Sequence, residues 1–258
     1  MDVRRYNSQA WDREVSSGSQ WSIPVDADEV SRARTGDWSI KLTSTLPTPS
    51  AWLEPVAGQR ILCLAGGGGQ QGPILAAAGA IVTVFDNSPA QLAQDRLVAD
   101  REGLTLELDE GDMADLSRYE DQSFDLIFNP ASNCFVSDLA PVWRECFRVL
   151  KPGGALLVGH MNPAYYLFDF AQSQKGVLEV AYKLPFSDPT SLAPADLATL
   201  ESDGTPYEFS HTLEILIGGQ LAVGFQLSGF YEDKMSAEEN DTLSKFMSTL
   251  FATRAVKP

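Results

Sequence analysis

A run of glycines after an apolar stretch is the part of this chain whose residue types best suit ligand chemistry. The consecutive glycines Gly66 to Gly69 follow apolar residues 61–64, and Asp86 ends the next apolar stretch. Glycine has no Cβ, so it adopts left-handed backbone angles and lets a ligand approach the main chain. A carboxylate at the end of the following strand can accept hydrogen bonds from a ribose diol. The pattern therefore predicts a nucleotide-like ligand at the edge of a parallel sheet.

Two ligand classes suit this geometry, and the glycines alone do not separate them. Read as Gly67-x-Gly69-x-x-Gly72, the run matches the dinucleotide fingerprint, and Asp86 lies 86 − 67 = 19 residues further on, close to the ~20 expected. Read from Ala65 to Gly69, the run instead resembles motif I of the class I S-adenosylmethionine (SAM) dependent methyltransferases. The rest of the chain has to decide between them.

Residues 59–159 show strand and helix patterns in alternation, as a doubly wound sheet requires. These elements must position the glycine run and Asp86. The helix after the second strand has Ser88 as N-cap and Gln91 in the capping-box position, and it is expected to end near Gly103. A helix over about 138–149 carries its apolar residues on one face. Strands are predicted near residues 60–65, 81–86, 104–108, 124–129, 154–160, 226–232 and 249–256.

The predicted fold class is α/β: a doubly wound, seven-stranded, mostly parallel sheet with an antiparallel last strand and helices on both faces. Residues 1–58 are expected to form an N-terminal extension or lid, and residues 59–258 the main domain. After the fifth strand, an aromatic stretch and a proline-bearing segment predict an inserted cap at about 162–210. Smaller predicted elements are a helix over Ala27 to Arg34, a strand pair of residues 178–184 with 207–210, and a helix over 211–225.

Composition and charge narrow the function. The formal charge is 19 − 35 = −16, which argues against a nucleic-acid partner because phosphate binding needs clusters of Lys and Arg. No apolar run approaches the ~18 residues that span a bilayer, and the N-terminus is polar, so we expect a soluble, cytoplasmic protein without a membrane partner. Cys63, Cys134 and Cys146 lack metal-like spacing, so we expect reduced thiols and no metal site. The sequence leaves the oligomeric state open.

Five blocks in order resemble the class I SAM-dependent methyltransferases, particularly the small-molecule branch with the quinone-biosynthesis C-methyltransferases (methyltransferase type 11). Two blocks argue most against a dehydrogenase: the pair Asp112-Met113 after the third strand, and the turn from Leu150 to Gly154 before the fifth. The resemblance implies a Rossmann-like enzyme that moves a methyl group from SAM to a small-molecule acceptor. The blocks are Ile61 to Gly69, Val82 to Leu92, Glu110 to Leu116, Phe124 to Pro130 and Arg148 to Leu157.

The resemblance also assigns cofactor-binding residues. Asp86 is expected to hold the ribose hydroxyls, Asp112 the adenine amino group and Met113 the adenine ring. Gln70 is expected near the methionine carboxylate, because N–H groups at a helix start favour an anion. The full set is Ala65, Gly66, Gly67, Gly69, Gln70, Asp86, Asn87, Ser88, Gln91, Asp112, Met113 and Asn129.

Two positions depart from the family pattern. The usual acidic residue of motif I falls on Cys63, and the first glycine falls on Ala65. We expect the extra glycines and the pair Gln70-Gln71 to replace the missing carboxylate at the methionine ammonium, through amide oxygens and main chain. Two alternatives stay open: an NAD(P)-dependent oxidoreductase, and a SAM-binding protein without turnover.

Methyl transfer is an in-line displacement, so the enzyme must hold a nucleophile about 3 to 3.5 Å from the methyl carbon, aligned and dry. Some acceptors also need a proton removed. His160, at the end of the fifth strand, is the candidate general base or substrate-binding residue, with His211 a weaker second; both also fit structural roles. The expected substrate pocket comprises Asn133, Tyr165 and Tyr166, with Trp11 and Trp21 as a lid over the cofactor.

Overall fold

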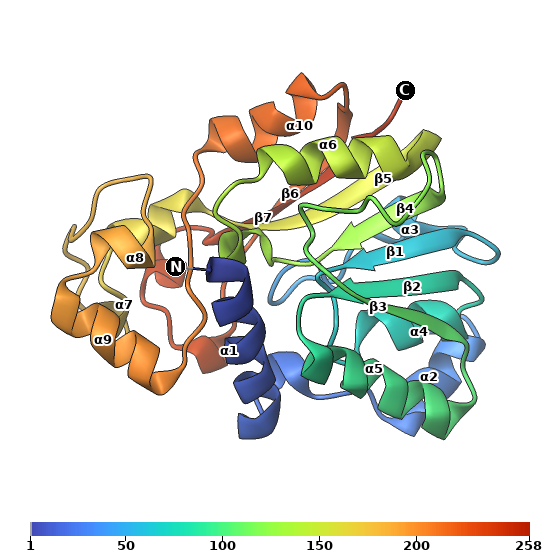
Figure 1. The fold of residues 1–258 in the computed structure, drawn as a ribbon, viewed down its shortest axis with the longest axis horizontal. Helices are drawn as coiled ribbons and strands as arrows, with labels where there is room; N and C mark the ends of the chain where they lie inside the picture. Colours follow the sequence, from blue (N-terminus) through green and yellow to red (C-terminus); the bar gives the residue numbers. More distant parts are fainter. Residues whose placement is uncertain (1) are drawn as a thin grey trace.

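The computed structural model describes residues 2–258, and its central element is one seven-stranded sheet (Figure 1). The strand order is β3-β2-β1-β4-β5-β7-β6, and β7 runs antiparallel to both of its neighbours. The pairs among the first five strands are parallel, which confirms the predicted fold class. The strands are β1 (Arg60–Leu64), β2 (Ile81–Asp86), β3 (Leu106–Glu110), β4 (Phe124–Asn129), β5 (Leu150–Met161), β6 (Gln226–Asp233) and β7 (Leu250–Val256).

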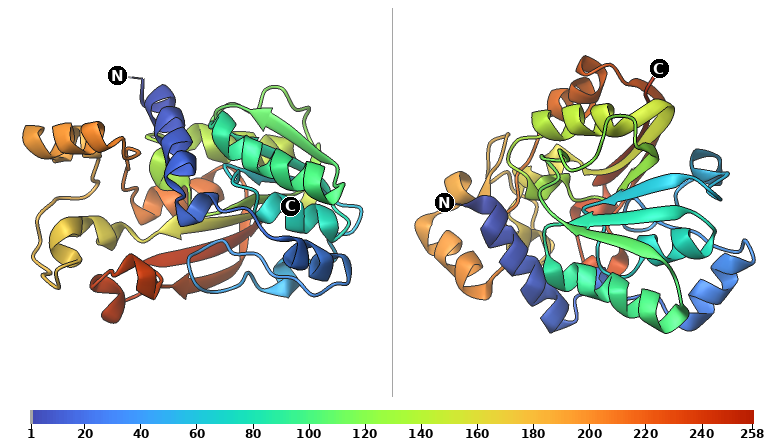
Figure 2. Two further views of the ribbon diagram at one scale, coloured as in Figure 1. Left: turned by 90° about the horizontal axis from the view of Figure 1, so that it is seen from below. Right: turned by 45° about the vertical axis from the view of Figure 1, so that its right-hand side comes forward.

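Helices cover both faces of the sheet, because alternate strand residues point to opposite sides and both sides are apolar. Leu62 and Leu64 pack in a cluster with the inner face of α6, whereas Ile61 and Cys63 pack with α4 on the other side. Figures 1 and 2 show α6 and α10 on one face, and α2, α4 and α5 on the other. These helices are α2 (Ala27–Arg34), α4 (Gln71–Ala77), α5 (Pro89–Glu102), α6 (Ala140–Val149) and α10 (Gly219–Ala222).

Local signals set the ends of several elements as predicted. The Ser88 hydroxyl accepts a hydrogen bond from the Gln91 N–H at 3.1 Å, and Gly103 ends α5 in the left-handed conformation. Only half of the capping box forms, because the Gln91 side chain turns to Ser22 instead. The third strand begins two residues later than predicted, since Leu104 still donates to the Ala99 carbonyl and completes the helix end.

A first helix, α1 (Val3–Ser17), has no counterpart among the predicted elements. Only Asn7 and Ala10 of this helix are buried, so the sequence carries no apolar stripe at helical spacing. Asp12 accepts hydrogen bonds from the Ser88 hydroxyl at 2.7 Å and the Ala90 N–H at 3.0 Å. Toward its start, α1 contacts the segment of residues 162–210, the predicted cap, and Figure 1 shows it lying between this segment and α5.

The chain after β5 forms short helices and loops. The predicted strand pair is wrong: only single bridges form, Phe168 with Val180 and Ser187 with Phe209. Pro185 and Pro189 flank the second bridge, and because they lack an N–H they cannot extend it into a ladder. The predicted helix over 211–225 is also shorter: it is a π-helical turn that runs into α10.

The remaining short elements are η1 (Gln20–Ser22), α3 (Ser50–Leu53), η2 (Asn133–Phe135), η3 (Pro163–Leu167), α7 (Phe170–Ser173), α8 (Asp188–Ser191), α9 (Pro194–Asp203), η4 (Glu214–Gly218), η5 (Ala237–Glu239) and η6 (Leu243–Lys245).

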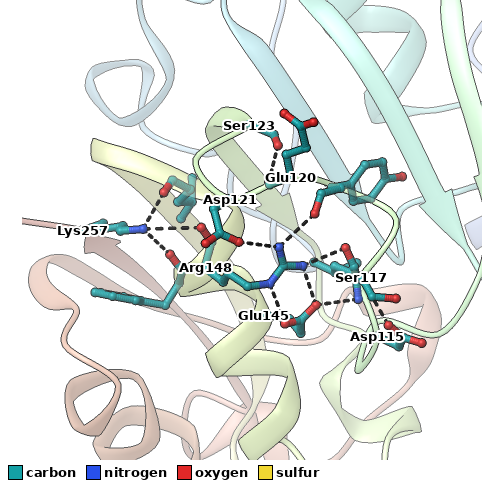
Figure 3. A network of polar contacts seen from close by, with 12 residues as sticks. Asp115, Ser117, Glu120, Asp121, Ser123, Glu145, Arg148 and Lys257 are labelled. Carbon is teal, nitrogen blue, oxygen red and sulfur yellow. Dashed lines mark hydrogen bonds and ion pairs between the residues drawn. The ribbon is translucent and has the colours of Figure 1, made fainter.

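The loop between β3 and β4 is fixed by one arginine of α6 (Figure 3). Arg148 makes two 2.8 Å bonds to the Glu145 carboxylate and donates to the carbonyls of Leu116 and Tyr119, both at 2.9 Å. It also pairs with Asp121 at 2.9 Å, and these bonds to the two carboxylates raise the pKa of Arg148 above its usual value. The second half of the loop is thereby attached to the last turn of α6.

Replacing Arg148 with alanine is expected to lower the free energy of unfolding by about 2 kcal/mol, because several charge-assisted bonds are lost from a partly exposed site. Urea denaturation followed by circular dichroism measures this change. Arg144→Ala is the matched control, since Arg144 is exposed on the same helix. Equal stability of the two variants would contradict the assigned role of Arg148.

Candidate functional site

The glycine turn opens onto a large cavity at the carboxyl edge of the sheet. The cavity has a volume of about 1140 Å³, which exceeds the usual size of a pocket for one small ligand. Its wall contains residues that follow β1, β2, β3 and β4, together with parts of the N-terminal extension and of the cap. The predicted residues in the wall are Ala65, Gly66, Gly67, Gln70, Asp86, Asn87, Gln91, Asp112, Met113, Tyr165, Trp11 and Trp21.

The glycine turn has room for no side chain at its centre. A Cβ on Gly67 would lie 2.8 Å from the Gln91 Cβ and 3.1 Å from Asp86 Oδ2. A Cβ on Gly68 would lie 2.8 Å from the Trp21 carbonyl oxygen, and Gly68 has a φ of +114°. Glycine is required at both positions, by space at the first and by space and backbone angle at the second.

Asp86 links the glycine turn to the start of α5. Its Oδ2 accepts the Gly67 N–H at 3.0 Å, and its Oδ1 accepts the Ser88 N–H at 3.0 Å. Burial raises the pKa of this carboxyl group above its usual value, while the main-chain hydrogen bonds act in the opposite direction. Each carboxylate oxygen can accept more than one hydrogen bond, so Asp86 retains acceptor capacity toward the cavity that it lines.

Asp95, in the middle of α5, is a site residue that the sequence analysis missed. Its side chain is fully buried, and Oδ2 accepts the Gly68 N–H at 3.0 Å. Burial raises the pKa of Asp95 to about 8, and the nearby Asp86 adds to this rise. The negative charge of Asp95 in turn contributes to the raised pKa of Cys63, after the dominant effect of burial. An acidic group therefore does contact the glycine turn, but from α5 and not from position 63.

Side-chain amides hydrogen-bond the N-terminal extension to residues beside the glycine turn. Gln70 Nε2 donates to the carbonyls of Gln20 and Ile23, both at 3.0 Å. Gln91 Nε2 donates to the Ser22 hydroxyl at 2.7 Å. The predicted position of Gln70 at the methionine carboxylate thus remains a prediction, while its amide N–H groups are occupied by main-chain oxygens.

The residues that follow β3 add an apolar side chain and a carboxylate to the cavity wall. Met113 is buried and packs in the same cluster as Phe85. Asp112 Oδ1 accepts the Ala114 N–H at 2.9 Å, which fixes the start of the loop after β3. Both Asp112 and Met113 face the cavity, as does Asn87 after β2.

Three predicted cofactor residues lie behind the cavity wall. The Gly69 carbonyl accepts the Val25 N–H at 2.9 Å, and Ser88 caps α5. Asn129 is fully buried, and its Nδ2 donates to the Leu64 carbonyl and the Ser132 hydroxyl, both at 2.8 Å. These hydrogen bonds support the cavity wall from behind. Direct contact of the three residues with the cofactor stays a prediction.

His160 is enclosed in the core. It stacks on Phe251 with ring centroids 4.7 Å apart, and its Nε2 lies 3.2 Å from the Thr253 hydroxyl. Complete burial lowers the pKa of His160 to about 3, so the ring is neutral near pH 7. Because His160 is absent from the cavity wall, we do not assign it the role of general base. His211 is also buried, and its Nε2 lies 2.8 Å from the Val136 carbonyl.

The cap side of the cavity combines aromatic, sulfur and acidic groups. Tyr165, Cys134 and Glu208 line it, and Trp11 packs edge-to-face on Phe135 at 5.0 Å. The predicted pocket residues Asn133 and Tyr166 lie behind this wall. They line a separate void of about 10 Å³, the volume that a single water requires.

Across residues 2–258, no three His, Cys, Asp or Glu side chains are grouped so that they could hold a metal ion. Over the same residues, no helix combines the length and the hydropathy needed to cross a membrane.

Comparison with known proteins identifies the family. Residues 62–158 match the family model described as a methyltransferase domain. The methyltransferase YbaJ of Bacillus subtilis is 45% identical over 252 residues, which covers 98% of this chain and 97% of YbaJ. A SAM-dependent methyltransferase structure from Mesorhizobium loti superimposes with a TM-score of 0.60 at 20% identity, over 80% of this chain and 94% of that one, and shows the same fold.

A more distant relative is the ubiquinone biosynthesis O-methyltransferase of Pseudomonas syringae pv. tomato, 32% identical over 115 residues. The match covers 44% of this chain and spans half the length of that enzyme. The sheet order and the glycine turn define a Rossmann-like methyltransferase fold. The chain belongs to the methyltransferase family and is a SAM-dependent methyltransferase with S-adenosylmethionine as its cofactor, which sets aside the oxidoreductase alternative.

Asp95→Asn is expected to change how stability depends on pH. The folded-state pKa of Asp95 is raised, so its contribution to stability is greatest below about pH 4 and is lost as the pH rises through about 8. Asparagine does not titrate and still accepts from Gly68. The variant should therefore gain stability relative to the parent by up to about 1.4 kcal/mol per pH unit between pH 5 and pH 8.

Urea denaturation at a series of pH values checks this prediction. Asp100→Asn, at an exposed position of the same helix, is the control for a change in net charge. If the two variants differ from the parent by the same amount at every pH, the assigned protonation of Asp95 is wrong.

Proposed function

We propose that this methyltransferase acts on a small-molecule acceptor that binds on the cap side of the same cavity as SAM. The observation that carries the proposal is the continuity of the cavity. One space of about 1140 Å³ is lined both by the glycine turn with Asp86 and by Tyr165 with Glu208. Small-ligand pockets commonly measure about 300 to 1000 Å³, so this volume suits a cofactor together with a small acceptor.

The residues of the cofactor half fit SAM. Asp86 supplies a carboxylate for the ribose diol, and Met113 supplies a buried apolar surface for the adenine ring. Asp112 supplies an acceptor for the adenine amino group, and the missing Cβ atoms at Gly67 and Gly68 keep the turn thin. When bound, SAM supplies an electrophilic methyl group on a sulfonium. The protein positions a nucleophile against that group and excludes water.

Two segments are assigned the role of excluding water from the cavity: the N-terminal extension and the cap. Residues 1–58 act as an N-terminal extension or lid, with Trp11 and Trp21 in the cavity wall. Residues 162–210 act as the substrate cap on the domain formed by residues 59–258. The contacts of α1 with both α5 and the cap support this assignment, because they join the two covers into one structure.

Direct contacts with the methyl acceptor are assigned to aromatic and to sulfur-containing side chains. Tyr165 and Phe135 offer aromatic surface, and Cys134 and Met161 offer soft apolar surface. Such a wall suits an acceptor with an aromatic or other flat apolar part. The negative net charge of the chain supports the proposal that the acceptor is not a nucleic acid. A cytoplasmic location also remains a prediction of the composition.

Replacing Asp86 with alanine is expected to raise the dissociation constant for SAM about 10- to 100-fold, because hydrogen bonds to a charged group are lost. Isothermal titration calorimetry with SAM measures the change. Asp100→Ala serves as the matched control on the exposed face of α5. Circular dichroism establishes that both variants fold, and an unchanged affinity in a folded Asp86→Ala protein would refute the proposed ribose contact.

Transfer itself is tested by incubating the protein with SAM that carries a radiolabelled methyl group and a bacterial metabolite extract. Label is expected to appear in the small-molecule fraction and to depend on the protein. Tight SAM binding without any transfer of label would count against a small-molecule acceptor.

A further inference from the structure

The cap contributes one acidic side chain to the cavity, Glu208, in the segment that returns from α9. Its carboxylate lines the acceptor side, and its Oε2 accepts the Tyr166 hydroxyl at 2.6 Å. The backbone N–H of Glu208 donates to Asp188 Oδ2 at 2.6 Å, so main chain and side chain are both held in place. This position lies in a loop, and no sequence motif marks it.

No basic side chain neutralises this carboxylate. None of the ion pairs found among residues 2–258 includes Glu208. The titratable groups that act on it are Tyr166, which lowers its pKa by hydrogen bonding, and Asp188, which raises it by charge repulsion. Cys134 and Tyr165 also lie close enough for the Glu208 charge to raise their pKa values. Burial is the largest effect and raises the pKa of Glu208 to about 7.

Other acidic and basic side chains are less suited to contact an acceptor proton. His160 and His211 lie outside the cavity wall. Asp86 is tied to the glycine turn by hydrogen bonds, on the cofactor side. Glu239 belongs to another part of the chain, after β6, and its Oε2 accepts from both the Ser44 hydroxyl and the Ser236 N–H. Glu208 retains a second oxygen, Oε1, for which the structure shows no hydrogen bond.

We propose that Glu208 is the catalytic residue that accepts the proton from the nucleophilic atom of the acceptor during methyl transfer. This inference rests on the proposed function, and it defines the acceptor class: a molecule whose nucleophilic oxygen or nitrogen carries a proton. Tyr166 is a positioning residue, because its hydroxyl orients the carboxylate and stabilises the charged form.

The step balances in atoms and electrons. The lone pair of the acceptor oxygen or nitrogen forms a bond to the methyl carbon, and the carbon–sulfur bond of SAM breaks with its electron pair staying on sulfur. The proton leaves the same oxygen or nitrogen and passes to the Glu208 carboxylate. The products are the methylated acceptor, S-adenosylhomocysteine and a protonated Glu208, which returns its proton to solvent after product release.

The chain offers a matched control for this assignment. Glu201, at the end of α9, accepts a hydrogen bond from the Tyr207 hydroxyl, just as Glu208 accepts one from Tyr166. Glu201 does not line the cavity. Glu208→Gln and Glu201→Gln thus make the same chemical change in two glutamate–tyrosine pairs of one cap, and only the first change reaches the acceptor side.

The experiment measures SAM binding by calorimetry and transfer of radiolabelled methyl into the metabolite-extract fraction that accepts it. Glu208→Gln is expected to bind SAM within twofold of the parent and to lower kcat at pH 8 by about 100-fold or more. In the parent, kcat should rise with pH through about 7, since the base acts when deprotonated. That rise should be lost in Glu208→Gln and kept in Glu201→Gln.

A second readout needs no acceptor. Protein labelled with ¹³C at the glutamate side-chain carboxyl is titrated by NMR, and one resonance is expected to shift near pH 7 and to vanish in Glu208→Gln. The absence of such a resonance overturns the assignment.

The kinetic outcomes separate this inference from the proposed function. If the parent transfers label and Glu208→Gln keeps a normal kcat and pH profile, only the role of Glu208 is overturned. A rise in KM for the acceptor with an unchanged kcat profile also overturns it, because the carboxylate would then only bind. If the parent binds SAM and transfers no label, the proposed function fails, and this assignment fails with it.

Discussion

The site depends on a close approach of main chains at the glycine turn. Gly67 lies against the side chain of Gln91, and Gly68 lies against the main chain of Trp21, at distances that leave no space for a Cβ. Because the turn is this thin, β1, β2, α5 and the N-terminal extension can meet at one point. The side chains of Asp86 and Asp95 accept the N–H groups of Gly67 and Gly68, and the Gln91 carbonyl oxygen also accepts from Gly68.

The same constraint accounts for a cysteine at position 63, where the resemblance to the family predicts an acid. Cys63 belongs to the apolar layer under α4, whereas Asp95 reaches the turn from the neighbouring helix. The acidic side chain beside the glycines therefore comes from a helix and not from the strand. A thiol at position 63 avoids the cost of burying a carboxylate in the strand, and Asp95 supplies an acceptor at the main chain of the turn.

Sequence alone was enough for the parts of the fold that local chemistry determines. The sheet strands alternate with helices bounded by Ser88 and Gly103, and the second and fourth strands begin and end where the apolar runs do. Residues whose roles come from distant contacts were not predictable. Asp95 is one polar residue in a helix, and Glu208 lies in a loop whose course depends on packing against Tyr166. His160 shows the converse, because its place after an apolar strand gives no sign that Phe251 and Thr253 enclose it.

Arg148 secures the loop after β3 largely through the carbonyl oxygens of Leu116 and Tyr119. Every residue type carries a carbonyl, so this anchor places little demand on which side chains occupy the loop. The identity of those side chains is left to their own packing, as in Leu116 and Tyr119 against the apolar layer under α6. The loop between β3 and β4 can therefore change in sequence, one residue at a time, and keep these two hydrogen bonds.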